Sequence, residues 1–138
     1  MSKKTFLTER QKTVLEMRER GWSQKKIARE LKTTRQNVSA IERKAMENIE
    51  KSRNTLDFVK FLKSPVRILC RRGDTLDEII KRLLEESNKE GIHVIHDSIT
   101  LAFLIREKAS HRIVHRVVKS DFEIGVTRDG EIIVDLNS

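Results

Sequence analysis

Residues 23–43 read SQKKIARELKTTRQNVSAIER, and this stretch decides the fold of the first third of the chain. Its apolar residues recur three and four positions apart, which is the spacing of one face of a helix. The residues on two such faces are Ile27, Ala28, Leu31, Val38 and Ile41. Because a small residue such as Ala28 lets a second helix pack closely, the pattern predicts a helix-turn-helix.

A first helix is predicted upstream of this stretch. Thr8 and Gln11 have the spacing of a capping box, which marks the start of a helix. Gly21 suits a left-handed cap at the helix end, with Trp22 packed back on the helix. The residues expected to join the core of the helix-turn-helix from this side are Leu7, Val14, Leu15 and Trp22.

Polar caps also mark the second and third helices. Ser23 is an N-cap residue for the second helix, and Thr33 with Gln36 forms a predicted capping box for the third. Lys32 stands in the intervening turn, where glycine is common. A left-handed conformation would strain a lysine, so we expect a slightly different turn.

The third helical pattern runs about 28 residues without Gly or Pro, to the only proline, Pro65. Either the helix breaks near Ser52-Arg53-Asn54, or it projects as a coiled-coil-like stalk that pairs with a second chain. The apolar stripe of Ile49, Leu56 and Val59 supports pairing, and we expect a homodimer.

The residues after Pro65 show mixed strand and helix signals. The expected elements are strand Val66–Cys70, a turn at 71–74, helix Thr75–Asn88, a short strand Ile92–Ile95, a helix at about 98–106 in preference to a strand, and the hairpin of Phe122–Val126 with Glu131–Leu136. Thr75 with Glu78 is expected to cap the first of these helices, and Asp97 or Ser98 the second. The fold class is therefore α+β: an N-terminal all-α helix-turn-helix domain, winged or plain, followed by a small mixed α/β domain. We place these domains at 1–55 and 66–138, with a helical linker at 56–65.

The positive charge is concentrated in the first domain. The net charge of +8 comes from 29 Lys and Arg against 21 Asp and Glu. Residues 1–55 contain 15 of these bases and 7 of these acids, whereas the remaining residues contain 14 of each. Clustered Lys and Arg neutralise phosphates and release counterions, so we expect a polyanionic partner for residues 1–55.

The outward face of the third helix has the residue types that read DNA bases in the major groove. Arg can bond guanine, Gln can bond adenine, and an Ala methyl can contact the thymine methyl. The predicted base-reading residues are Thr34, Arg35, Gln36, Ser39 and Ala40. The predicted phosphate contacts are Lys25, Lys26, Arg43 and Lys44.

Other motifs predict no further chemistry. His111 and His115 would share a face if they were helical, but no second cysteine joins them, and His93 and His96 could point to opposite faces, so we expect no metal. Cys70 is expected to be buried, and no catalytic motif or cofactor loop is present, so we predict no enzyme and no cofactor. No apolar run reaches the roughly 20 residues of a membrane span and the N-terminus has no signal core, so we expect a cytoplasmic protein.

The stretches Leu7–Gln11, Gln24–Leu31 and Thr34–Ser39 resemble the DNA-binding region of the archaeal Tfx family of transcriptional regulators. They are less closely similar to the final, promoter-reading region of bacterial sigma factors. The Tfx resemblance extends over nearly the whole chain, including Phe122–Ile124 and its hairpin, whereas the sigma resemblance stops near residue 50. The Tfx resemblance implies a cytoplasmic archaeal regulator that binds near a promoter.

We therefore predict a sequence-specific transcription regulator that binds double-stranded DNA. The domain at 66–138 would dimerise, sense a ligand, or do both. Alternatives are an RNA-binding or translation-linked module that uses the same basic face, a sigma-like promoter-recognition factor, and a small enzyme with an N-terminal docking domain. Five Phe, one Trp and no Tyr offer little for base stacking, which disfavours the RNA module.

Overall fold

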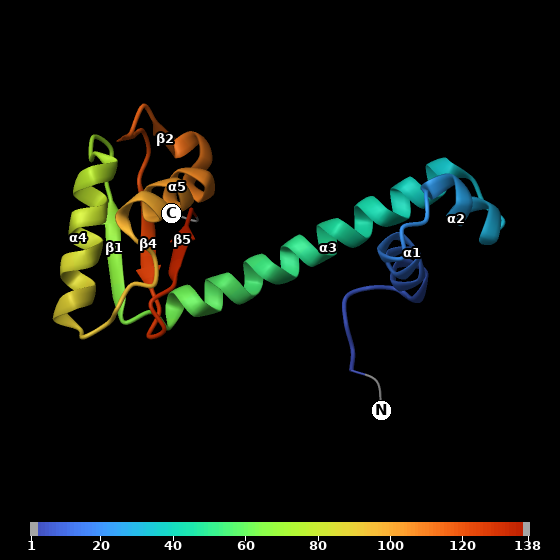
Figure 1. Cartoon of the computed structure of the whole chain (residues 1–138), viewed down its shortest axis with the longest axis horizontal. Helices are drawn as coiled ribbons and strands as arrows, with labels where there is room; N and C mark the ends of the chain where they lie inside the picture. Colours follow the sequence, from blue (N-terminus) through green and yellow to red (C-terminus); the bar gives the residue numbers. More distant parts are fainter. Residues whose placement is uncertain (1–2, 137–138) are drawn as a thin grey trace. The chain divides into compact units, whose positions relative to one another are not determined.

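The computed structural model describes residues 3–136, and the chain divides after Thr55 into two compact units, here called unit 1 and unit 2 (Figure 1). The elements in chain order are α1 (Glu9–Glu19), α2 (Gln24–Glu30), α3 (Arg35–Leu62), β1 (Val66–Cys70), α4 (Leu76–Lys89), α5 (Ser98–Ala109), the 3-10 helix η1 (Ser110–Arg112), β2 (Ile113–Val114), β3 (Val117–Val118), β4 (Phe122–Val126) and β5 (Ile132–Asp135). The predicted α+β class is confirmed. Unit 1 has no strand among its described residues, so the helix-turn-helix is the plain kind.

Both predicted ends of α1 are confirmed. The Thr8 hydroxyl accepts a hydrogen bond from the Gln11 backbone N–H, and the Gln11 side chain accepts one from the Thr8 N–H. Gly21 is left-handed with φ of +86°. The Trp22 N–H donates to the Met17 carbonyl at 3.1 Å, which closes the last turn of the helix.

The turn between α2 and α3 differs from prediction in two ways. Lys32 adopts the left-handed conformation, with φ of +55°, so the expected departure from that turn is wrong. The Thr33 N–H donates to the Ala28 carbonyl at 2.9 Å, and this bond holds the lysine in place. Thr34, not Thr33, caps α3, because its hydroxyl accepts from the Asn37 N–H at 3.0 Å.

The core of unit 1 is small and combines all three helices. Its fully or nearly fully buried residues are Val14, Ile27, Ala28 and Val38, and the apolar residues packed against them are Met17, Trp22, Leu31 and Ile41. Leu7 and Leu15 are only partly buried and do not belong to this cluster, whereas Met17 does. This core fixes the rotation of α3 about its own axis.

α3 is continuous over 28 residues, so the alternative with a break near Ser52-Arg53-Asn54 is wrong. The Ser52 hydroxyl donates to the Asn48 carbonyl at 2.9 Å, which satisfies a polar side chain inside the helix. In unit 2 the end of α3 packs on the sheet, where Phe61 is 2% exposed. A Cβ on Gly125 would lie 2.9 Å from the Phe61 ring, so only glycine fits there.

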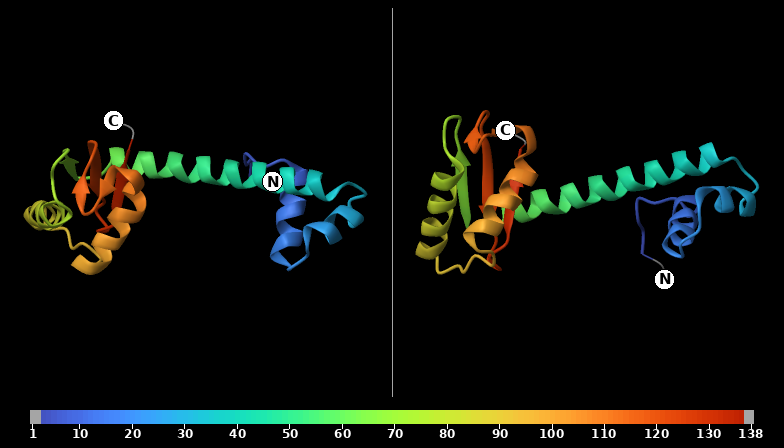
Figure 2. Two further views of the ribbon diagram at one scale, coloured as in Figure 1. Left: turned by 90° about the horizontal axis from the view of Figure 1, so that it is seen from above. Right: turned by 45° about the horizontal axis from the view of Figure 1, so that its top comes forward.

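Unit 2 has an antiparallel sheet of order β1-β4-β5 with α4 and α5 on one face (Figures 1 and 2). β1 pairs with β4 from Val66 opposite Val126 to Cys70 opposite Phe122, as expected for alternating strands. β4 pairs with β5 across the predicted hairpin. Burial raises the pKa of the Cys70 thiol to about 12, which keeps it protonated.

Several predictions for unit 2 are tested by these coordinates. Strand Val66–Cys70, the capping box of Thr75 with Glu78 and the helix capped by Asp97 are confirmed. The predicted strand Ile92–Ile95 is wrong, because its Ile92 N–H donates to the Ser87 carbonyl and its Ile95 N–H to the Gly130 carbonyl, and these bonds form no ladder. The small β2–β3 hairpin was not predicted. Among the described residues, no helix is long and apolar enough to cross a membrane.

Glu42 joins all three helices of unit 1 through its carboxylate. Arg18 Nε in α1 donates to Glu42 Oε2 at 3.0 Å, and Gln24 Nε2 in α2 donates to Oε1 at 2.8 Å. Partial burial acts to raise the pKa of Glu42. The hydrogen bonds from Gln24 and Arg18, together with the Arg18 charge, outweigh burial and lower that pKa.

Replacing Glu42 with Ala should lower the free energy of unfolding of unit 1 by about 1–2 kcal/mol, because two donors lose their acceptor. The lowered pKa means that the stabilisation is present above the pKa of the unfolded chain and is lost as pH falls through the folded pKa. Urea unfolding at about pH 7 and about pH 3 measures both effects. Glu47→Ala is the matched control, since Glu47 makes only an exposed pair with Lys44 at 3.7 Å. Equal losses in the two variants at neutral pH would contradict the role assigned to Glu42.

Candidate nucleic-acid interface

The first turn of α3 presents two unpaired polar side chains to solvent. Arg35 and Gln36 are exposed, and neither has a hydrogen bond or ion pair to another side chain within residues 3–136. Gln36 is free because Thr34 is the cap, so the glutamine does not reach back to Thr33. The Thr33 N–H donates instead to the Ala28 carbonyl at 2.9 Å, and Asn37 Nδ2 donates to the Thr33 hydroxyl at 2.9 Å.

The other predicted base-reading residues lie on the same face of α3. Ser39 and Ala40 are partly exposed one turn after Arg35 and Gln36, and Arg43 is exposed one turn further. Val38, at 0% exposure, points into the core from between them. The helical spacing therefore brings these residues to one outward strip, with Thr34 exposed at its start as the cap.

Besides Arg43, which lies in this strip, the predicted phosphate contacts are exposed lysines of α2 and α3. Lys25 and Lys26 are exposed in the first turn of α2, and Lys26 Nζ is 4.1 Å from the centroid of the Trp22 ring. This cation–π contact holds the Lys26 side chain over a partly buried aromatic ring. Lys44 is exposed and pairs with Glu47 at 3.7 Å.

Sequence reasoning missed three residues of this region. Arg29 at the end of α2 and Lys32 in the turn are exposed cations whose side chains have no ion-pair partner within residues 3–136, and they lie beside the start of α3 in the chain. Their position next to the predicted turn was the signal that could have identified them. Glu42 was also missed, because its partners are 18 and 24 residues away in sequence and no local pattern marks such a contact.

The histidines do not form a site in the described part of the chain. His111 lies in η1 and His115 in the β2–β3 turn, so the helical spacing considered for them does not occur. No group of three or more His, Cys, Asp or Glu among residues 3–136 is placed to hold a metal ion. His93 and His96 lie in the irregular segment before α5.

Two known protein families match the chain, and their matches meet near the boundary between unit 1 and unit 2. The family described as "DNA-binding protein, TFX, C-term" matches residues 52–134, and the family described as "Sigma-70, region 4" matches residues 6–51. The two matches meet inside α3, close to the boundary between the two compact units.

Full-length relatives are also found. The chain is 99% identical to the DNA-binding protein Tfx of Methanothermobacter thermautotrophicus over 138 residues, which is 100% of both chains. Proteins that carry the name of a transcriptional regulatory protein match from Methanocaldococcus jannaschii, at 37% identity over 97% of this chain and 98% of that one, and from Pyrococcus abyssi, at 42% over 88% and 82%. The full-length match and the family match over more than half of the chain show that it belongs to the Tfx family of DNA-binding proteins.

Proposed function

We propose that the chain is a sequence-specific transcription regulator that binds double-stranded DNA through unit 1, with the start of α3 in the major groove. The observation that carries this proposal is that the first turns of α3 bury Val38 completely while Arg35 and Gln36 stay exposed and without a hydrogen-bond partner within residues 3–136. The relatives named as DNA-binding or transcriptional regulatory proteins support it. Such a role places the protein with the genome, in the cytoplasm.

In this proposal the two sets of polar residues act differently. Arg35 and Gln36 read base edges, with Thr34, Ser39 and Ala40 in contact with bases beside them. The cations Lys25, Lys26, Arg43 and Lys44 bind phosphates and fix the register of the protein on the duplex. The net charge of +8 on residues 1–55 supplies the sequence-independent part of the affinity.

An RNA-binding module is the alternative that uses the same basic face. It would need aromatic rings free to stack on bases. In the described part of unit 1, Phe6 is an exposed ring at 83%, but Trp22 is partly buried under Lys26. One free ring before α1 is a weak stacking platform, so duplex DNA is the preferred ligand.

A division of labour between the two units follows from the charge. We propose that residues 1–55 form the DNA-binding domain, residues 56–65 a helical linker, and residues 66–138 a domain for dimerisation or sensing. A homodimer would let a regulator read two half-sites one helical turn apart. The exposed α3 stripe of Leu56, at 64%, and Val59, at 39%, supports pairing of two chains along this helix.

Arg35→Ala is expected to weaken binding to a duplex selected from a random pool by about 1–3 kcal/mol and to relax preference at one base pair. Lys25→Ala should weaken selected and scrambled duplexes equally and reduce the salt slope by about one. Arg53→Ala is the control, because Arg53 lies on α3 in unit 1 but pairs with Glu50 at 3.3 Å, away from the turn. The affinity of each of the three variants for the selected and the scrambled duplex is measured across a salt series. If Arg35→Ala weakens both duplexes to the same degree, the contact face is elsewhere.

Light scattering at micromolar concentration should give twice the chain mass of 16.1 kDa. Leu56→Glu is expected to shift the protein to monomers, because it places a charge inside the apolar stripe. Asn54→Glu is the matched control, since Asn54 is exposed on the other side of the same helix turn. A monomer mass for the natural chain, with and without DNA, would refute dimerisation along α3.

A further inference from the structure

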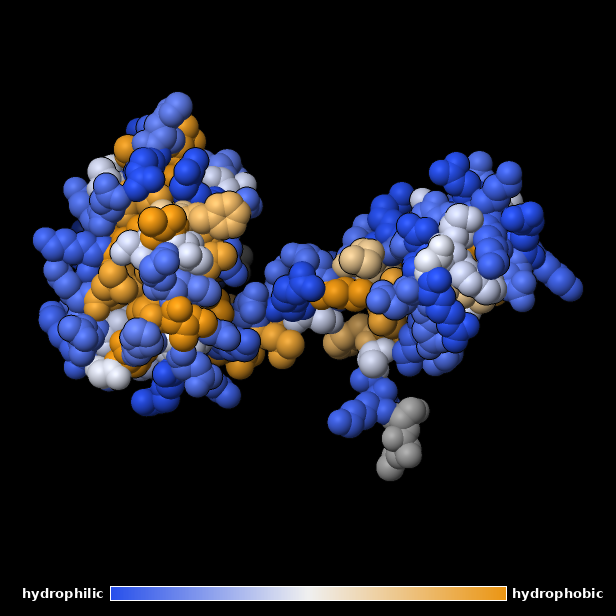
Figure 3. Space-filling model, viewed as in Figure 1, coloured by the Kyte–Doolittle hydropathy of each residue, from blue (hydrophilic) through white to orange (hydrophobic). Residues whose placement is uncertain are grey.

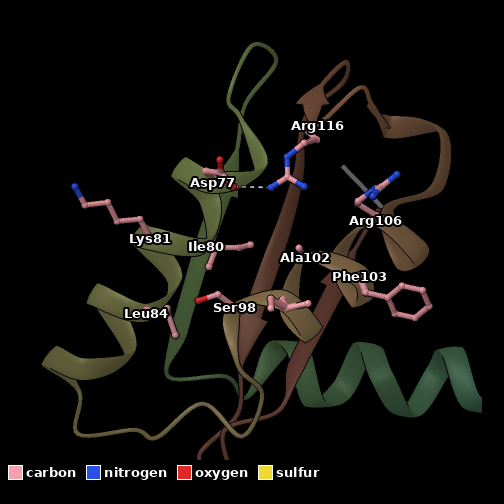
Figure 4. Close-up of a pocket in the computed structure, with 10 residues that line it drawn as sticks. Asp77, Ile80, Lys81, Leu84, Ser98, Ala102, Phe103, Arg106 and Arg116 are labelled. Atoms are coloured by element: carbon pink, nitrogen blue, oxygen red, sulfur yellow. Dashed lines mark hydrogen bonds and ion pairs between the residues drawn. The ribbon is translucent and has the colours of Figure 1, made fainter.

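A groove of about 680 Å³ lies between α4 and α5 in unit 2 (Figure 4). Its floor is formed by Ile80, which is buried, and by Leu84 and Ala102, which are partly buried. This volume falls within the roughly 300–1,000 Å³ of small-molecule sites in proteins, which are lined mostly by apolar groups with a few polar ones. The groove therefore has the size and the lining of a ligand site.

One wall of the groove carries apolar side chains that the fold leaves uncovered. Ile99 is 84% exposed and Phe103 is 62% exposed, one helical turn apart on α5. The opposite face of α5 holds Leu101 and Ile105 at 0% exposure, so Ile99 and Phe103 are not part of the core. Figure 3 shows apolar atoms reaching the surface of unit 2 in several places. Exposed apolar side chains beside a groove gain free energy when a ligand covers them.

The rim of the groove is cationic. Arg106 and Lys81 have no hydrogen-bond or ion-pair partner within residues 3–136, and Arg116 pairs with Asp77 at 2.6 Å. Three cations and one carboxylate thus line the groove, which leaves an excess of positive charge. Guanidinium groups bind carboxylates through two parallel hydrogen bonds, so the rim suits an anionic head group.

Backbone strain places Arg116 on this rim. His115 and Arg116 occupy the β2–β3 turn with φ of +52° and +63°, where glycine and asparagine are usual. This left-handed region is unfavourable for residues that carry a Cβ. The Leu76 N–H donates to the Arg116 carbonyl at 2.9 Å and holds the strained residue against α4.

We propose that this groove binds a small amphipathic carboxylate, with its apolar body on Ile80, Leu84 and Ala102 and its carboxylate on Arg106 and Arg116. A second copy of the chain fits less well, because a two-fold interface would set the cationic rim against itself. The proposal rests on the sensing role proposed for residues 66–138 and does not depend on DNA binding, since the ligand and the DNA contact different units.

Decanoate, below the concentration at which it forms micelles, is the probe for titration of the isotope-labelled full chain followed by its amide NMR spectrum. We expect saturable one-to-one shifts centred on α4, α5 and residues 115–116. Arg106→Gln should weaken binding about tenfold, because one charge-assisted contact is lost. Ala102→Trp should abolish binding by filling the floor. Arg128→Gln is the matched control, an exposed arginine of unit 2 outside the groove, and should leave the affinity unchanged. The amide spectrum of each variant also reports whether it is folded.

Decyltrimethylammonium and decanol separate the charge from the apolar chain. We expect both compounds to bind more weakly than decanoate. Equal binding of the three would mean a non-specific apolar patch and would overturn the proposal. Absence of saturable shifts at the groove, or an unchanged affinity in folded Arg106→Gln, would overturn it as well. So would groove shifts that depend on protein concentration without any ligand, because a second copy would then cover the groove.

Discussion

The burial of Val38 against Val14 and Ile27 is the contact on which the proposed function depends. All three side chains are at 0% exposure, so α3 cannot rotate about its axis without opening a cavity in a very small core. Helical geometry then determines which residues face outward, and these include Arg35 and Gln36. The Glu42 carboxylate supports the same arrangement from the partly exposed side, because it accepts bonds from both other helices.

Much of the fold could be predicted from local sequence, because its signals act over a few residues. The caps at Thr8, Thr75 and Asp97 and the hairpin around Gly130 each depend on neighbours within about four positions. The failures have physical causes of longer range. Segment Ile92–Ile95 has strand-like residues, but its backbone bonds go to the end of α4 and to the β4–β5 turn, and the β2–β3 turn uses non-glycine residues that no turn rule favours.

The candidate site was predictable in its residue types and less so in its details. Charge and helical periodicity were enough to predict the outward strip from Thr34 to Arg43, and those residues lie on one face of α3. The position of the cap was wrong by one residue, since Thr33 and Thr34 offer the same hydroxyl chemistry. That shift has a consequence, because Gln36 is left unbound and its amide is available to a base.

The most direct test of the central claim is amide NMR mapping of the isotope-labelled full chain with a duplex selected from a random pool. If the start of α3 enters the major groove, the largest shifts should fall on residues 34–43, with smaller ones at Lys25 and Lys26. Largest shifts confined to residues 66–136, with the first two turns of α3 unchanged, would contradict the account.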